Sequence, residues 1–372
     1  MKKFTLILAT VALLAAGCTK TEVVGPQNRK GINFAAYTAK TTKAAQEDVT
    51  TTNLTKFEVT AFGNNAVYFD NLTFEKHTTN NITVWESQTK YFWPAFPLTF
   101  CAYNTPSEYD TPVQPTGFTR NINTTSQTLE VIPALELAKQ EDLVAAYAAY
   151  KTESDVEDIS KSLPLTFNHY LTQVTVNATN ENDTYKVLVD GVKIANMVGH
   201  GTYTFSNNKM IAAPFNTAVY TATFGGKELT PGAKEVMTNA GTGRWYLIPQ
   251  DVTSWDPKTD RTNTKHGTYL ALKVKRTVNN AGALKIYPAT GDDSGWMAVP
   301  IPSGLKFEQG KKYTVNINFF ANNGAGYVDP EAGSDLDGNG AADDMGMKII
   351  GGEIKFNATV DPWGNNDIEI NL

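Results

Sequence analysis

Cysteine is scarce in this chain, and its scarcity limits the kinds of site that the chain can build. The 372 residues include only two cysteines, Cys18 and Cys101. Two cysteines cannot form a disulfide framework, and they cannot make a metal site by themselves. Cys101 lies in the alternating run "PLTFCAYN". There we expect a buried structural cysteine and not a reactive thiol.

The chain also lacks an excess of positive charge and any clustering of histidine. Its formal net charge of -6 argues against a nucleic-acid partner, because phosphate binding needs a basic face. No HxxxH or HxH spacing links the four histidines, and no serine-elbow or P-loop pattern is present. We therefore predict that the protein is not an enzyme. The histidines are His77, His169, His200 and His266.

No apolar stretch reaches ~20 residues, the length that a membrane-spanning helix needs. Lys2 and Lys3 instead precede the apolar run "FTLILATVALL", which is typical of a signal peptide. The following "LLAAGC" resembles the bacterial lipobox, in which the cysteine receives lipid on its sulfur. We predict a lipoprotein signal peptide over 1–17, lipidation of Cys18 and a polar tether over 18–30. The alternative is a plain signal peptide with a coincidental cysteine.

Alternation of apolar and polar residues dominates the rest of the chain. Period-2 runs broken by Gly, Pro, Asn and Asp indicate antiparallel sheets with one buried face. These runs are "GINFAAY", "KFEVTAFG", "PLTFCAY", "QVTVNAT", "KKYTVNINFF" and "GEIKFNATV". "KVLVDGVKIA" predicts a hairpin that turns at Asp190-Gly191. Residues 134–151 are rich in helix formers, so propensity alone predicts a helix there.

A change of composition near Ser162-Leu163-Pro164 predicts a domain boundary. The charged stretch "YKTESDVEDISKS" comes before this point, and a fresh run of strands begins after it. We therefore predict an N-terminal β-domain over 31–163 and a C-terminal β-domain over 164–372.

The stretch "DLDGNGAADD" carries a calcium-like spacing of oxygen ligands. Positions 1, 3, 5 and 9 of a calcium loop would be Asp335, Asp337, Asn339 and Asp343. It is not an EF-hand, because position 12 is Gly346 where a bidentate Glu is needed. Two interpretations remain open: a looser calcium loop and a solvated acidic turn.

Three of the six tryptophans are informative about the core or about a binding site. Trp93 in "KYFWPAFPLTF" and Trp245 in "GRWYLIPQ" lie beside strand patterns and are expected in the core. Trp255 in "TSWDPKTDRTN" has polar neighbours, and we expect it to be exposed. An exposed indole can stack on a sugar ring, so Trp255 is the candidate ligand-binding residue.

Taken in order along the chain, several segments resemble the fimbrillin family of bacterial pilus subunits. They are the lipobox leader, "GINFAAYTAKTTKA", "KFEVTAFG", "WESQTKYFWPAFPLTFCAYNTP", "QEDLVAAYA", "LPLTFNHYLTQVTVNA", "YLIPQ", "GKKYTVNINF" and "VDPWGNNDIEI". The resemblance implies an all-β chain of two transthyretin-like antiparallel β-sandwich domains in tandem. It also implies that "QEDLVAAYA" is a strand, against the helix propensity of this segment.

The resemblance further implies a route of assembly. Family members are exported as outer-membrane lipoproteins, and a trypsin-like protease then removes the first strand, whose groove accepts a strand from the next subunit. The candidate cleavage residues here are Arg29, Lys30, Lys40 and Lys43. A cut after Arg29 or Lys30 would leave "GINFAAY" in place, whereas a cut after Lys40 or Lys43 would remove it. The donor in shaft subunits is C-terminal. Here "EIKFNATV" is expected as the last strand of the second sandwich, and "DIEINL" either closes that sandwich or serves as the donor.

These observations predict a structural or adhesive fimbrial subunit at the bacterial cell surface, in the shaft or as an anchor or tip component. Its expected partners are other fimbrial subunits, the outer membrane through the lipid at Cys18, and a host or bacterial surface glycan or protein. The alternative is a surface lipoprotein that does not polymerise and binds a glycan or another outer-membrane component.

Overall fold

The computed structural model describes most of the chain. The described residues are 29–38, 49–105, 118–158, 160–181, 185–214, 217–229, 234–235, 237, 243–279, 285–288, 294–319, 326–334, 336, 339–349 and 355–362. Within them the regular structure is β-strand, apart from three single 3-10 turns. The prediction of an all-β fold is confirmed, while its transthyretin-like detail stays a prediction. None of the helices in these ranges is long and apolar enough to cross a membrane.

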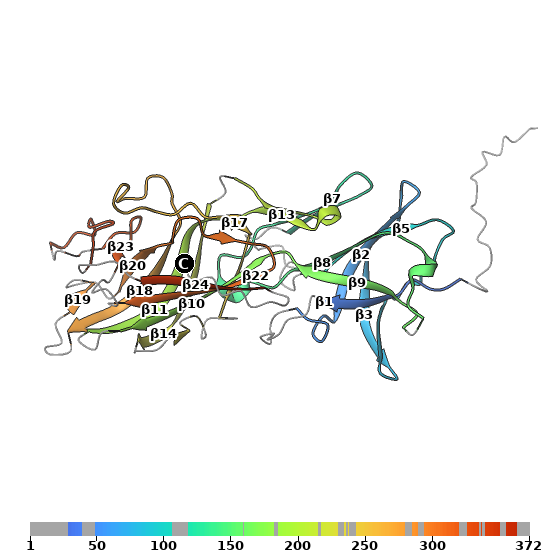
Figure 1. The fold of residues 1–372 in the computed structure, drawn as a ribbon, viewed down its shortest axis with the longest axis horizontal. Helices are drawn as coiled ribbons and strands as arrows, with labels where there is room; N and C mark the ends of the chain where they lie inside the picture. Colours follow the sequence, from blue (N-terminus) through green and yellow to red (C-terminus); the bar gives the residue numbers. More distant parts are fainter. Residues whose placement is uncertain are drawn as a thin grey trace, which may run out of the picture.

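The N-terminal half forms a closed barrel of seven strands, at one end of an elongated molecule (Figure 1). The order around the barrel is β1-β4-β3-β2-β5-β8-β9. The strands are β1 (Phe34–Thr38), β2 (Lys56–Gly63), β3 (Ala66–Thr79), β4 (Ile82–Glu86), β5 (Leu98–Tyr103), β8 (Val144–Lys151) and β9 (Leu163–His169). Aromatic and aliphatic side chains from all seven strands fill its interior.

The C-terminal half packs two sheets face to face around the largest hydrophobic core. The first sheet contains β15 (Lys234–Glu235), β10 (Thr172–Asn180), β22 (Lys311–Phe319), β24 (Lys355–Pro362) and β16 (Trp245–Leu247). The second contains β14 (Thr217–Leu229), β11 (Tyr185–Val198), β18 (Tyr269–Asn279), β20 (Gly295–Pro300), β23 (Tyr327–Val328) and β19 (Lys285–Tyr287). The short strands β17 (Gln250–Asp251) and β21 (Lys306–Phe307) pair with each other.

A third sheet lies between the two halves (Figure 1). Its strands are β6 (Phe118–Ile122), β7 (Gln127–Val131), β12 (Gly201–Thr204) and β13 (Lys209–Ala212). Because β7 pairs with β12, this sheet joins segments from both predicted domains. A separate hydrophobic cluster beneath it includes Cys101, Tyr103, Tyr203 and Tyr246. The halves are therefore connected by a packed layer and not by a free linker.

The predicted boundary at residues 163 and 164 falls at the start of β9. This strand pairs with β1 and β8, so residues 163–169 lie in the barrel. The division of the chain into domains stays a prediction. Most strand pairs are antiparallel, as expected, but β1–β9 and β10–β22 are parallel.

One local prediction is wrong, and one alternative that rested on propensity alone is not realised. The expected hairpin at Asp190-Gly191 is one continuous strand, β11, with register shifts at Gly191 toward both neighbouring strands. A Cβ at Gly191 would lie 3.2 Å from the carbonyl oxygen of Ala222, so this glycine serves a close approach of backbones and not a turn. The propensity-based helix over 134–151 is also absent.

That segment contains one 3-10 turn, Leu137–Lys139, and then strand β8. The strand that the family resemblance implied is therefore correct. Val144 and Ala146 face the barrel interior, while Ala145 packs into the cluster beneath the third sheet. Burial on both faces outweighs the small difference in intrinsic propensity between helix and strand for these residues.

The predictions for Trp93, Trp245 and Cys101 are confirmed as core positions. Trp93 is 1% exposed and Trp245 is 0% exposed. Cys101 is fully buried, and burial raises the pKa of its thiol to about 12. A thiol with this pKa is almost entirely protonated at neutral pH, which makes it a poor nucleophile.

Candidate functional site

The strand that closes the barrel, β1, is held unequally on its two sides. It pairs in parallel with β9 over five residues, from Phe34↔Leu163 to Thr38↔Phe167. On its other side it pairs with β4 at one position only, Phe34↔Trp85. The strand is therefore paired more extensively with β9 than with β4.

The residues just before β1 continue along the same seam. The amide of Ile32 donates to the carbonyl of Tyr91 at 2.8 Å, and the amide of Trp93 donates to the carbonyl of Lys30 at 3.2 Å. On the opposite side, the amide of Leu163 donates to the carbonyl of Asn33 at 2.8 Å. The whole stretch from residue 30 to residue 38 therefore acts as one inserted segment.

Side chains from this segment fill the centre of the barrel. Phe34 is 0% exposed, and its ring lies 4.7 Å from the Phe74 ring and 5.3 Å from the Phe100 ring, both edge-on. Ile32 and Ala36 point into the same core, at 2% and 5% exposure. Removing the segment would leave a groove lined by aromatic rings and flanked by two unpaired strand edges.

The candidate cleavage residues lie on both sides of this segment. Arg29 immediately precedes the segment and Lys30 is its first residue. Both are exposed, and the Lys30 amine lies 3.9 Å from a Glu153 carboxylate oxygen. A cut after either residue leaves the closing strand attached to the chain. Lys40 and Lys43 fall outside the described residues, between Thr38 and Val49 in sequence. Cleavage there would sever the covalent link between β1 and the rest of the barrel.

The chain is fixed again where it re-enters the barrel at Val49. The amide of Val49 donates to Asp142 Oδ2 at 2.7 Å. The other oxygen of Asp142 lies 3.0 Å from Nδ1 of His169, and both of these side chains are almost fully buried. This anchor does not depend on β1, so we expect the remaining strands to stay in place after a cut between residues 38 and 49.

The expectation that Trp255 is exposed is wrong, since it is only 2% exposed. Its ring centroid lies 5.5 Å from that of Tyr269 and 5.7 Å from that of Tyr327, and Nε1 donates to the carbonyl of Asp260 at 2.7 Å. The polar residues that follow it fold into turns in which the side chains of Asp256 and Asp260 accept backbone amides. These turns cover the indole.

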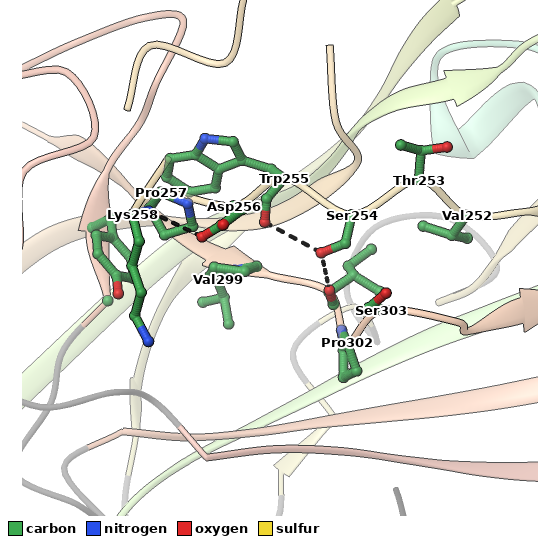
Figure 2. A pocket seen from close by; sticks show the side chains of 14 residues that line it. Val252, Thr253, Ser254, Trp255, Asp256, Pro257, Lys258, Val299, Pro302 and Ser303 are labelled. Carbon is green, nitrogen blue, oxygen red and sulfur yellow. Dashed lines mark hydrogen bonds between the residues drawn. The ribbon is translucent and has the colours of Figure 1, made fainter. Parts of the chain in front are cut away.

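A cavity of about 810 Å³ lies beside Trp255. Figure 2 shows Val299 and Pro302 on its wall and the polar side chains of Asp256 and Lys258 nearby. The Ser254 hydroxyl contacts the carbonyls of Trp255 and Ile301, so the one proton that it can donate is used within the protein. The volume suits a small ligand. The binding role of Trp255 stays a prediction. The exposed ring on which that prediction was based is not present in the structure.

The acidic loop is described in part. Asp335 and Asp337 lie outside the described residues, whereas Asn339 and Asp343 are exposed. The Asn339 side chain accepts the amide of Ala341 at 2.7 Å, and Gly340 has φ +86°, as the predicted turn requires. Within the described ranges no group of three His, Cys, Asp or Glu could hold a metal ion. Calcium binding stays a prediction.

One feature of the site was not visible in the sequence. The partner of β1 is β9, "LPLTFNH", and the two strands are separated by most of the N-terminal half. Both read as alternating strands, but nothing in either one specifies their pairing. Cys18, the predicted lipidation residue, lies outside the described residues.

Comparisons with known proteins place the chain in a family. A family model described as fimbrillin-like matches residues 21–329. A fimbrial protein from Bacteroides vulgatus has a similar fold, with 14% identity, a TM-score of 0.53, and coverage of 90% of this chain and 100% of the other. The fimbrial anchor protein Mfa2 from Porphyromonas gingivalis gives 10% identity, a TM-score of 0.31, and coverage of 78% and 91%. A search of curated proteins found no match. The family model spans most of the chain and indicates a structural protein and not an enzyme: the chain belongs to the fimbrillin-like family.

Proposed function

We propose that this protein is a structural and adhesive fimbrial subunit, exported as an outer-membrane lipoprotein through Cys18 and assembled by exchange of β1. The observation that carries the proposal is the closing position of β1, which is buried at Phe34 and paired on both sides. A protease that cuts after Lys40 or Lys43 frees this strand. The groove that remains accepts an extended strand from the next subunit.

The energetics of such an exchange favour a long-lived assembly. Five backbone pairs contribute roughly 1 kcal/mol each. Three buried apolar side chains add roughly 1.5–3 kcal/mol each. The gross sum is on the order of 10–15 kcal/mol before the cost of ordering the donor, which is enough for a stable non-covalent contact.

The position of β24 indicates which C-terminal segment is free to act as the donor strand. This strand pairs with β22 from Lys311↔Pro362 to Asn318↔Lys355, so "KFNATV" is part of the first C-terminal sheet. We therefore assign the donor role to "DIEINL", which lies outside the described residues. A copy that retains its lipid and its own β1 can serve only as an anchor at the membrane.

A second candidate function rests on the cavity beside Trp255. A surface lipoprotein that stays monomeric could hold a sugar there, since the cavity lies within the size range of small-ligand sites. Glycan binding by monomers, without filaments, is the behaviour that this alternative predicts.

Electron microscopy of cells with and without the gene tests the proposed function. We expect surface filaments on wild-type cells, loss of those filaments on deletion, and recovery when the wild-type gene is returned. Filaments that are unchanged by deletion, together with retention of the purified monomer on a glycan array, would instead favour the lipoprotein that binds a sugar.

A further inference from the structure

A lysine and an aspartate are buried against each other on the outer face of the second C-terminal sheet. Lys193 extends from β11, and Asp329 directly follows β23. The two side chains are 11% and 0% exposed, and the Lys193 amine contacts Oδ2 of Asp329. The pair therefore joins the middle of the sheet to the segment that carries the acidic loop.

Aromatic rings shield this contact from water. The Lys193 amine lies 4.8 Å from the centroid of Trp296 and 5.7 Å from that of Tyr269. Taking two charges out of water is costly even when they are paired. Transfer of one proton from the ammonium to the carboxylate converts both groups into neutral forms. The neutral amine is a nucleophile, and the neutral acid is an electrophile.

The second carboxylate oxygen of Asp329 sits in a cradle of three donors. Oδ1 accepts the Tyr269 hydroxyl at 2.9 Å, the amide of Glu331 at 2.9 Å and the amide of Ala332 at 3.0 Å. Burial, and then the charges of Asp329 and Glu331, raise the pKa of Tyr269, so its hydroxyl keeps the proton that it donates. Donors arranged in this way stabilise negative charge that develops on a carbonyl oxygen.

We propose that Lys193 and Asp329 condense to form an intramolecular isopeptide bond. After the internal proton transfer, the lone pair of Nζ attacks Cγ of Asp329, the new N–C bond forms, and the carbonyl electron pair moves onto Oδ1. The tetrahedral centre then collapses: the electron pair on Oδ1 re-forms the carbonyl, the Cγ–Oδ2 bond breaks, and Oδ2, which already carries the first transferred proton, takes a second proton from Nζ and leaves as water. This condensation requires no oxidant, metal or cofactor.

Several contacts hold the two reacting groups together. The amide of Asp329 donates to the carbonyl of Trp296 at 3.1 Å. Glu331 Oε1 accepts the side-chain amides of Asn196 at 2.6 Å and Asn263 at 3.1 Å. Fixing two reactants in contact replaces a bimolecular encounter by an intramolecular step and greatly raises their effective concentration. Exclusion of water also disfavours hydrolysis of the bond once it has formed.

The residue after Asp329 closes off a competing reaction. An aspartate side chain can be attacked by the backbone amide of the following residue, but here that residue is Pro330, which has no N–H. The Asp329 carboxyl group therefore cannot react with the following backbone amide, and the Lys193 amine remains as its nucleophile. The resulting bond would tie β11 covalently to the segment after β23, a tie suited to a subunit that is pulled along a filament.

Peptide mapping of the full chain, purified from cells and digested with trypsin after denaturation, tests this proposal. We expect a branched peptide that joins residues 187–209 to residues 313–348, uncut at Lys193, with the summed mass of both minus one water. Recovery of the two peptides separately, with trypsin cutting after Lys193, would overturn the proposal. This measurement needs no variant, so it does not depend on the folding of a mutant.

Two controls show whether the geometry around Lys193 and Asp329 is responsible for formation of the bond. The exposed pair Lys306 and Asp251, 3.2 Å apart, lies in the same chain and should give no branched peptide. Tyr269→Phe keeps the ring and removes one donor to Oδ1, so the bond should form on the order of 10²–10³-fold more slowly in newly made chains. An unchanged rate in the folded Tyr269→Phe variant would contradict the assignment of the donor cradle.

Discussion

Replacing Phe34 with alanine is expected to lower the free energy of unfolding of the barrel by about 3–5 kcal/mol. Phe34 is fully buried in the closing strand, and its ring contacts the Phe74 and Phe100 rings edge-on. The truncation leaves a cavity at the centre of the barrel and also removes the ring pairs. Urea unfolding, followed by circular dichroism at equal protein concentration, measures the difference.

Tyr37→Ala is the matched control in the same strand. Tyr37 is 46% exposed, and its hydroxyl contacts an exposed Glu157 carboxylate at 3.3 Å. Loss of this side chain should change the free energy of unfolding by less than about 1 kcal/mol. Equal effects of the two substitutions would show that β1 is not anchored through its inward face.

Locking β1 to β9 with a disulfide is expected to abolish filament formation. Tyr37 and Thr166 are register partners in the parallel pair, and both are exposed. Adjacent strands lie about 4.7–4.9 Å apart, within the Cα separation that a disulfide spans. In the Tyr37→Cys/Thr166→Cys variant the cut after Lys40 or Lys43 can still occur, but β1 stays in the groove. Reductant should restore filaments, which electron microscopy can count.

The control staple lies elsewhere in the same barrel. Thr78 and Thr83 are register partners on β3 and β4, with their hydroxyl oxygens 3.0 Å apart. A Thr78→Cys/Thr83→Cys variant should form filaments with or without reductant. The native Cys101 does not interfere, since it is buried and burial raises its thiol pKa to about 12. Filaments from the β1–β9 variant without reductant, or no recovery when reductant is added, would count against strand exchange.

Much of the strand framework could be predicted from the sequence because burial of one face imposes a period of two. "KFEVTAFG" corresponds to β2, "QVTVNAT" lies within β10, and "KKYTVNINFF" covers β22. Large aromatic residues next to such runs, Trp93 and Trp245, were correctly expected in the core. These predictions depend only on local pattern and on hydrophobic burial.

The features that failed depend on contacts between distant segments. The dipeptide Asp190-Gly191 is typical of a two-residue hairpin turn. Here the strand stays continuous because it pairs with β14 on one side and β18 on the other. Trp255 has polar neighbours, yet the turns after it and the ring of Tyr327 bury it. The parallel pairing of β1 with β9 and the contact between Lys193 and Asp329 also join segments whose local sequence specifies no partner.

The N-terminal residue of subunits isolated from surface filaments tests the central claim most directly. Mass spectrometry of the assembled form should give Thr41 or Ala44 as the first residue, because a cut after Lys40 or Lys43 removes β1. A first residue at Lys30 or Gly31 would mean that the closing strand is still present. Filament subunits that begin at lipidated Cys18 would likewise contradict assembly by exchange of this strand.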